Sequence, residues 1–208
     1  MLLQTVTEDE INIFSSPARL VFIGNSGSGK TSLFIRVAQK YSHIFDQVVV
    51  IGGNINNIPG VKNLKIDPDF NPLHEDVDEK TLYLFDDTLY QNNLVKLAAQ
   101  CFTRLRHKGS SIAFCSQSLY FNSQDFRIIL QNTTHLFLLK LRCLRQVSLF
   151  AKSFLSKEEI ERFLEIYKKV VLKNKYRYIL IDYTVDFDSV LQIRSNVVGE
   201  SLEICYKI

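Results

Sequence analysis

One stretch of the chain has residue types and a spacing that suit phosphate binding. Residues 24–31 read GNSGSGKT, which fills every fixed position of the pattern GxxxxGK[ST]. Glycines let the backbone curl so that its N–H groups point at anionic oxygens, and a following helix adds the positive end of its dipole. Lys30 can then reach the β- and γ-phosphates of a nucleoside triphosphate, and the Thr31 hydroxyl can bind Mg²⁺. The predicted nucleotide-binding residues are Gly24, Asn25, Ser26, Gly27, Ser28, Gly29, Lys30, Thr31 and Ser32.

The residues on either side of this loop predict the elements that must position it. An apolar, β-branched run at 20–23 predicts a buried strand, and apolar residues at helical spacing predict a helix over 32–40. A glycine-rich turn with a chance lysine is the simpler interpretation. Strand, loop and helix in this order favour a site for ATP and Mg²⁺.

Two carboxylates end another apolar run, TLYLFDD at residues 81–87. We predict that this run is a Walker B strand in which Asp86 binds the metal, through water, and Asp87 is the base that orients the attacking water. An Asp at the end of a strand is also a common helix N-cap, so Asp87 could instead cap the helix predicted over 89–107.

Gln117 belongs to the end of a further apolar strand, predicted at 110–118. A polar amide at the carboxyl end of a sheet strand points into the crevice where ligands bind. Gln117 is therefore predicted to sense the γ-phosphate or to hold the lytic water. The alternative is a hydrogen bond at the start of the next loop.

A basic cluster, TRLRHKG at residues 103–109, closes the helix before that strand. One interpretation is favourable charge at the C-terminus of a helix. The other is an arginine finger offered to the γ-phosphate of a neighbouring subunit. Composition alone does not separate them.

Composition and hydrophobic pattern indicate an α/β fold in one domain. The chain has 208 residues, of which 46% are apolar and 23% charged. Apolar strands alternating with helices predict a mostly parallel central sheet covered by helices on both faces. Together with the GxxxxGK[ST] motif, we expect a P-loop NTPase of the RecA/ASCE-like class. We expect a lead-in at 1–16, a nucleotide-binding core at 17–150, and a C-terminal helix with edge strands at 151–208. Further strands are predicted at 47–52, 64–66, 134–141, 176–183 and 202–206, and helices at 121–131 and 156–173.

Charge and cysteine content limit the compartment and the partners. The four cysteines form no CxxC pair, so we expect reduced residues in a reducing compartment and no zinc site. No apolar run is long enough for a membrane helix, and residues 1–12 lack the basic region of a secretory signal. The net charge of +3 is too small to indicate nucleic-acid binding by itself. A basic stretch of Lys140, Arg142, Arg145 and Lys152 could face a pore or simply be a solvated surface.

Taken in order, these motifs resemble the FtsK/HerA superfamily of P-loop ATPases. More closely, they resemble the poxvirus-type genome-packaging ATPases of double-stranded DNA viruses and related mobile elements. The resemblance runs from about residue 16 to residue 196. It rests on the P-loop, FDD at 85–87, RHK at 106–108, SQ at 116–117, Arg127 and Asn132 five residues apart, and YILID at 178–182 followed by Arg194.

The resemblance implies an ATP-driven motor that assembles as a homo-oligomeric ring and threads duplex DNA into a viral capsid at its portal vertex. It implies an intracellular location in the host, or association with the virion. It assigns phosphate and metal binding to Lys30, Thr31 and Asp86, base catalysis to Asp87 and sensing to Gln117. Arg106 is the preferred finger, with Arg104 and Arg127 as alternatives.

Two other functions use the same motifs. One is a HerA-like helicase, or a conjugative or segregation pump, which shares the chemistry but has another partner. The other is an accessory of DNA replication that uses ATP only as a switch. A GTPase fits less well, because NKYR at 174–177 lacks the Asp of a guanine-reading NKxD.

Overall fold

The structure is a computed structural model that describes residues 3–6, 13–14, 17–53, 55–74, 80–86, 91–173, 176–186, 192–198 and 203–206. For residues 3–6, 106, 107 and 203 it describes the backbone alone. No helix within these ranges is long and apolar enough to cross a membrane.

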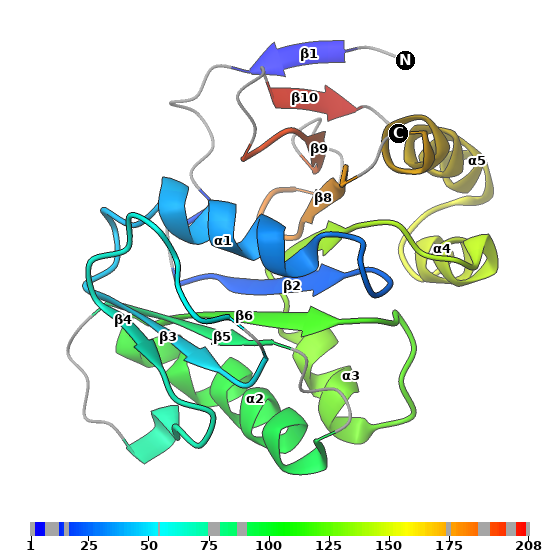
Figure 1. Cartoon of the computed structure of the whole chain (residues 1–208). Coiled ribbons are helices and arrows are strands. Elements are labelled where there is room, and N and C mark those ends of the chain that lie inside the picture. Colours follow the sequence, from blue (N-terminus) through cyan, green and yellow to red (C-terminus); the bar gives the residue numbers. More distant parts are fainter. Residues whose placement is uncertain are drawn as a thin grey trace.

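A ten-stranded sheet forms the centre of the described structure, in the order β1-β10-β9-β8-β7-β2-β6-β5-β3-β4 (Figure 1). The strands are β1 (Leu3–Val6), β2 (Arg19–Ile23), β3 (Gln47–Ile51), β4 (Leu64–Ile66), β5 (Thr81–Phe85), β6 (Ser111–Ser116), β7 (His135–Leu138), β8 (Ile179–Asp182), β9 (Ile193–Ser195) and β10 (Glu203–Tyr206). All pairs from β7 to β4 are parallel, and all pairs from β7 to β1 are antiparallel. The predicted parallel sheet is thus confirmed for the strands from β7 to β4, and it carries an antiparallel extension from β8 to β1.

Helices cover both faces of the parallel part, which is why its strands are buried along nearly their whole length. The helices are α1 (Lys30–Lys40), α2 (Asn92–Arg104), α3 (Gln124–Gln131), α4 (Leu144–Ala151) and α5 (Lys157–Tyr167). The α1 helix packs on one face through an apolar stripe that includes Phe34 and Val37. The other four helices share the second core, on the opposite face of the strands (Figure 1).

Two of the predicted helices end as α-helices earlier than the sequence pattern indicated, whereas α1 and α3 end where it placed them. The α2 helix stops at Arg104 and continues as a 3-10 helix, Leu105–Lys108, before Gly109 turns the chain with a φ of 72°. The α5 helix begins with the predicted capping box of Ser156 and Glu159, and its last turns are a π-helix, Lys168–Leu172. A third short helix, 3-10 in geometry, spans Pro72–His74.

A buried arginine fastens the end of α2 to the sheet. Arg19, at the start of β2, is 2% exposed. Its Nε donates to the carbonyl of Phe102 at 3.1 Å, and its Nη1 donates to the carbonyl of Ser110 at 3.0 Å. The guanidinium therefore satisfies backbone acceptors at the helix end, as a buried charge must.

A second buried charged group ties three strands together. Asp182, at the end of β8, accepts a hydrogen bond from Arg194 of β9 and lies 3.5 Å from Nε2 of His135 of β7. All three side chains are almost fully buried. This cluster, Asp182–His135–Arg194, joins the antiparallel extension to the parallel sheet.

Candidate nucleotide-binding site

The glycine-rich loop lies at the carboxyl edge of the parallel strands. It connects β2 to α1, and its first residues are tied to both neighbouring strands. The Gly24 N–H donates to the carbonyl of Ser116, the last residue of β6, at 3.1 Å, and the Asn25 N–H donates to the carbonyl of Lys140 after β7, at 3.0 Å. The loop is thus held at the point where ligands bind in open α/β sheets.

Three glycines of the loop are required by its conformation and packing. Gly27 and Gly29 have φ angles of 73° and 96°, in the left-handed region that side chains disfavour. Gly24 has no room for a side chain, because a Cβ there would lie 2.8 Å from the Cβ of Leu139. The loop backbone, a cradle for anionic oxygens in the predicted site, therefore takes a path that residues with a Cβ disfavour.

Lys30 and Thr31, the first residues of α1, point toward the loop and toward β5. The Lys30 Nζ donates to the carbonyls of Gly24 and Asn25, at 2.8 and 3.1 Å. The Thr31 hydroxyl donates to Asp86, at 3.0 Å from Oδ2 and 3.3 Å from Oδ1. The metal ligands predicted from two distant stretches of sequence thus lie side by side.

A cavity of about 330 Å³ opens at this place. Its lining consists of Ser26, Gly27, Gly29, Lys30, Thr31 and Ser32 from the loop and helix start, and of Asp86, Cys115, Gln117 and Tyr176 from elsewhere. Gln117 therefore faces the same cavity as Asp86, where the sequence placed it. Ser28 does not line the cavity, and its hydroxyl is buried next to Gly24 without a hydrogen-bond partner in the described structure.

These groups fit a triphosphate with Mg²⁺. The cradle offers backbone N–H groups and an ammonium to anionic oxygens, and Thr31 with Asp86 offers the hard oxygen ligands that Mg²⁺ prefers. Within the described ranges, no group of three or more His, Cys, Asp or Glu residues could hold a metal. An Mg²⁺ ion would then depend on phosphate oxygens for the rest of its ligands, which is its usual mode of binding.

Two of the predicted catalytic residues are not placed by the structure. Asp87 lies outside the described residues. Arg106 lies in the 3-10 helix after α2, but its side chain is outside the described part. Of the alternatives, Arg104 is the last residue of α2, and Arg127 is exposed in the middle of α3.

The structure adds two residues that sequence reasoning missed. Gly53 follows β3 with a φ of 70°, and a Cβ there would lie 2.9 Å from the Cβ of Asp86. The pair of glycines after β3 was the available signal. Tyr176 lines the cavity from the segment before β8, and nothing in the sequence pointed to it.

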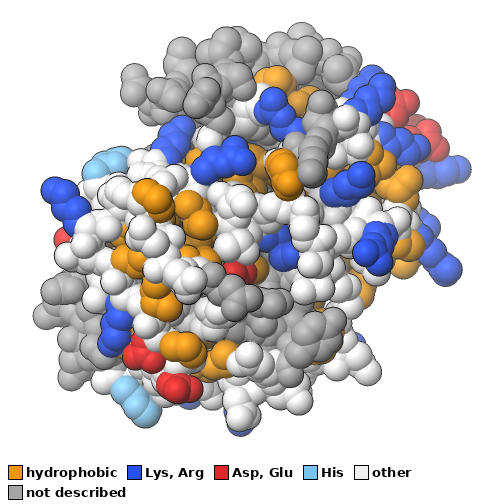
Figure 2. All heavy atoms as spheres, viewed as in Figure 1, with side chains coloured by type: hydrophobic (Ala, Val, Ile, Leu, Met, Phe, Trp, Pro, Cys, Tyr) orange, Lys and Arg blue, Asp and Glu red, His pale blue; other side chains and the backbone are white. Residues whose placement is uncertain are grey.

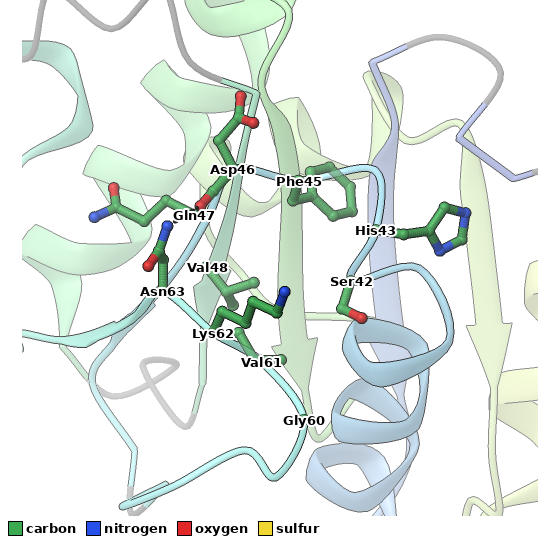
Figure 3. A pocket seen from close by; sticks show the side chains of 10 residues that line it. All are labelled: Ser42, His43, Phe45, Asp46, Gln47, Val48, Gly60, Val61, Lys62 and Asn63. Carbon is green, nitrogen blue, oxygen red and sulfur yellow. Dashed lines mark hydrogen bonds between the residues drawn. The ribbon is translucent and has the colours of Figure 1, made fainter.

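A second pocket of about 330 Å³ lies beside the amino-terminal end of β3, away from the carboxyl ends of the strands (Figure 3). It is formed by the segment between α1 and β3 and by residues 60–63, including His43, Asp46 and Lys62. Figure 3 shows these side chains around the amino end of β3. None of the predicted site residues lies there, so the candidate nucleotide site is the cavity at the carboxyl edge.

Among solved structures, this fold has clear counterparts. The genome packaging NTPase B204 from Sulfolobus turreted icosahedral virus 2, in complex with AMP, matches with a TM-score of 0.56 and 14% identity over 92% of this chain and 98% of that chain. Its complex with AMPPCP matches with a TM-score of 0.54 and 16% identity over the same shares. The DNA-packaging ATPase B204 from Sulfolobus turreted icosahedral virus matches with a TM-score of 0.52 and 14% identity over 91% of this chain and 97% of that chain. The chain has their fold. No protein-family model and no curated protein matches it.

Proposed function

We propose that the chain is a single-domain P-loop ATPase that uses ATP hydrolysis to translocate double-stranded DNA, in the packaging of a viral genome into a capsid. The observation that carries the proposal is the convergence of Lys30, Thr31 and Asp86 at one cavity. The end-to-end likeness to packaging NTPases, described as complexes with AMP and AMPPCP, supports it.

The strand order supports the RecA/ASCE-like class. In the sheet, β6 lies between β2, which leads into the loop, and β5, which leads into Asp86. Its last residue precedes Gln117, so that three neighbouring strands deliver the phosphate loop, the sensor and the metal ligand to one edge. Such convergence is what in-line attack on a γ-phosphate needs.

Each residue then has a distinct task in hydrolysis. Lys30 leaves its contacts with the loop carbonyls and neutralises charge on the β- and γ-phosphates. Thr31 and Asp86 hold Mg²⁺, which supplies charge neutralisation at the phosphate oxygens when bound. Gln117 positions the attacking water, and Asp87 accepts its proton. Arg106 of a neighbouring subunit stabilises the charge that spreads over the γ-phosphate in the transition state.

The proposed partners are duplex DNA, further copies of the chain in a ring, and the capsid portal vertex, within the host cell or the virion. The surface offers charge for DNA: on the face shown in Figure 2, Lys and Arg side chains gather over α4 and α5. Arg145 is an exposed residue of α4, and the exposed Arg142 and Lys152 lie just before and just after this helix. Phosphate contacts of this kind bind DNA without regard to sequence, as a packaging motor requires.

The test is ATP hydrolysis by the purified protein with and without long linear duplex DNA, read as phosphate release. We expect duplex DNA to stimulate ATP turnover. We also expect a motor that moves along the duplex to displace a third strand annealed to it. Lys30→Ala should abolish turnover, because it removes the ammonium group that neutralises charge on the β- and γ-phosphates. Lys62→Ala, in the pocket beside the amino-terminal end of β3, is the matched control and should hydrolyse ATP like the wild type.

Two results would contradict the proposal. Near wild-type turnover in Lys30→Ala would overturn the P-loop assignment. Hydrolysis that ignores duplex DNA and displaces no third strand would favour an ATP switch over a motor.

A further inference from the structure

We propose that Tyr176 forms the nucleobase subsite of this cavity and that its ring stacks on the base of a bound nucleoside triphosphate. The inference rests on the proposed function, since it presupposes that the glycine-rich loop holds the phosphates. It assigns a ligand class, a planar aromatic base, to the end of the cavity that the phosphate groups leave open.

The topology gives the cavity two distinct ends. Asp86 and Gln117 follow β5 and β6, on one side of β2. Tyr176 precedes β8, whose first residue, Ile179, pairs with Leu138 at the carboxyl end of β7, on the other side of β2. The phosphate loop follows β2 and lies between the two. A triphosphate whose γ-phosphate points to the metal side must therefore direct its nucleoside to the side of Tyr176.

Tyr176 is the side chain suited to receive a base. Of the residues that line the cavity in the described part of the chain, it alone is aromatic. Its ring lies directly against the loop, since a Cβ on Gly29 would be 2.8 Å from the Tyr176 Cδ1. The residue is nevertheless 49% exposed, so the ring offers surface to a ligand.

The ring position is set by the backbone on which it is built. Tyr176 has a φ of 63°, in the left-handed region that a tyrosine rarely adopts. The two residues after it hold that segment to the stretch after β9. Arg177 donates to the Asn196 side chain, and the hydroxyl of the buried Tyr178 accepts the Val198 N–H at 2.9 Å. Unfavourable φ values persist only where the surrounding structure enforces them, and these contacts fix the two residues that follow Tyr176.

Stacking on an aromatic ring tolerates every base, because each base has a π-face. The subsite should therefore strengthen the binding of nucleoside triphosphates without strong discrimination between adenine and guanine. This lack of discrimination distinguishes the Tyr176 subsite from the guanine pocket of a GTPase, in which an acidic side chain hydrogen-bonds to the edge of guanine.

The test compares Tyr176→Asn and Tyr176→Phe with the wild type by titration calorimetry in Mg²⁺ buffer. Asparagine removes the ring and tolerates the left-handed backbone, and phenylalanine keeps the ring. The probes are non-hydrolysable analogues of ATP and GTP, together with inorganic tripolyphosphate, which has no base. We expect Tyr176→Asn to weaken binding of both analogues about tenfold or more and to leave tripolyphosphate affinity unchanged. Tyr176→Phe should bind all three probes like the wild type.

Several results would overturn the subsite. They are unchanged analogue affinity in Tyr176→Asn, an equal loss of analogue and tripolyphosphate affinity, or a Tyr176→Phe variant that behaves like Tyr176→Asn. A wild type that binds neither analogues nor tripolyphosphate would instead remove the phosphate site, and the proposed function with it. Tyr176→Gly, which relaxes the positive φ, should repeat the pattern of Tyr176→Asn and guards against a folding defect of the latter.

Discussion

At the scale of single residues, the contact between Thr31 and Asp86 separates two neighbouring acids by role. Asp86 is 5% exposed and already bonded to the hydroxyl that would share its metal. Because Asp86 is committed to the metal, we predict that Asp87 is the catalytic base. Asp87→Asn should bind Mg·ATP but hydrolyse it roughly a hundredfold more slowly or worse, because the lytic water loses its proton acceptor. Asp86→Asn should weaken Mg²⁺-dependent binding instead. Nucleotide affinity and single-turnover hydrolysis measure the two effects.

Two results would contradict the roles assigned to Asp86 and Asp87. An equal loss of binding in both variants would contradict this division of roles. A lowered melting temperature with unchanged hydrolysis in Asp87→Asn would support the helix cap as its function. Asp69→Asn, an exposed acid in the segment before η2 (Pro72–His74), is the matched control.

How far residues could be predicted depends on whether their role is local. The loop from Gly24 to Thr31 was predictable, because phosphate binding there follows from a fixed spacing and from glycine conformations. Asp86 and Gln117 were predictable from the rule that carboxyl ends of parallel strands meet at one edge. Gly53 and Tyr176 could not be assigned, since each acquires its place only through a neighbour that is distant in sequence.

At the scale of elements, the sequence predicted the apolar strands and helices and missed those that break the hydrophobic pattern. Strand β9 is three residues long and has a buried arginine at its centre, Arg194, which reads as a surface residue in sequence. Helix α4 has no side-chain cap at its start and carries exposed Leu144 and Leu149. In both cases tertiary contacts with the rest of the fold overrode the local signal.

The Asp182–His135–Arg194 cluster holds the antiparallel extension to the parallel sheet and should do so in a pH-dependent way. Burial by itself would raise the pKa of the Asp182 carboxyl, but its hydrogen bond with His135, the charge of His135 and two hydrogen bonds from Thr184 outweigh burial and lower the pKa to about 2. The folded state thus binds this proton less tightly than the unfolded chain. The resulting stabilisation, roughly 2 kcal/mol, is present above about pH 4 and is lost as the pH falls toward 2.

Asp182→Asn should lower the free energy of unfolding at pH 7 by about 3–5 kcal/mol, because it leaves the buried Arg194 charge uncompensated. The difference from the wild type should shrink as the pH falls from 4 toward 2, where the wild-type carboxyl gains its proton. Urea unfolding at several pH values measures both effects. Asp186→Asn, an exposed neighbour, is the control and should change stability little at any pH. A pH-independent difference would contradict the linkage.

At the scale of the whole molecule, the sheet separates Arg106 from the phosphate loop of its own chain. The 3-10 helix that contains Arg106 leads into the amino end of β6, whereas the loop lies beyond the carboxyl end of the neighbouring β2. The six residues of β6, at about 3.3 Å each, place roughly 20 Å between those edges. An arginine side chain does not span that distance, so Arg106 can act as a finger only on a neighbouring subunit. Arg127 starts closer to the carboxyl edge, one turn into α3.

A finger that acts between subunits can be replaced by a neighbour, which gives a specific prediction. Arg106→Ala should bind ATP normally but lose hydrolysis on the order of a thousandfold, the value of such fingers in other nucleotide hydrolases. Lys30→Ala is also inactive alone, but it keeps its own Arg106. In a mixture, it donates that arginine to an Arg106→Ala active site that still has Lys30. Hydrolysis should therefore reappear in the mixture, and it should rise with protein concentration and with duplex DNA, because both favour assembly.

The mixing experiment needs two controls, one for the loss of positive charge and one for which arginine is the finger. Arg36→Ala, an exposed arginine on α1, should keep wild-type hydrolysis and so exclude a general effect of losing positive charge. Arg127→Ala, mixed in the same way with Lys30→Ala, asks whether α3 supplies the finger instead. Assembled rings that show no recovery at any mixing ratio, or an Arg106→Ala protein as active as the wild type, would rule out Arg106. Recovery with Arg127→Ala alone would then assign the finger to α3 and place the carboxyl edge of one subunit's sheet against the nucleotide of the next.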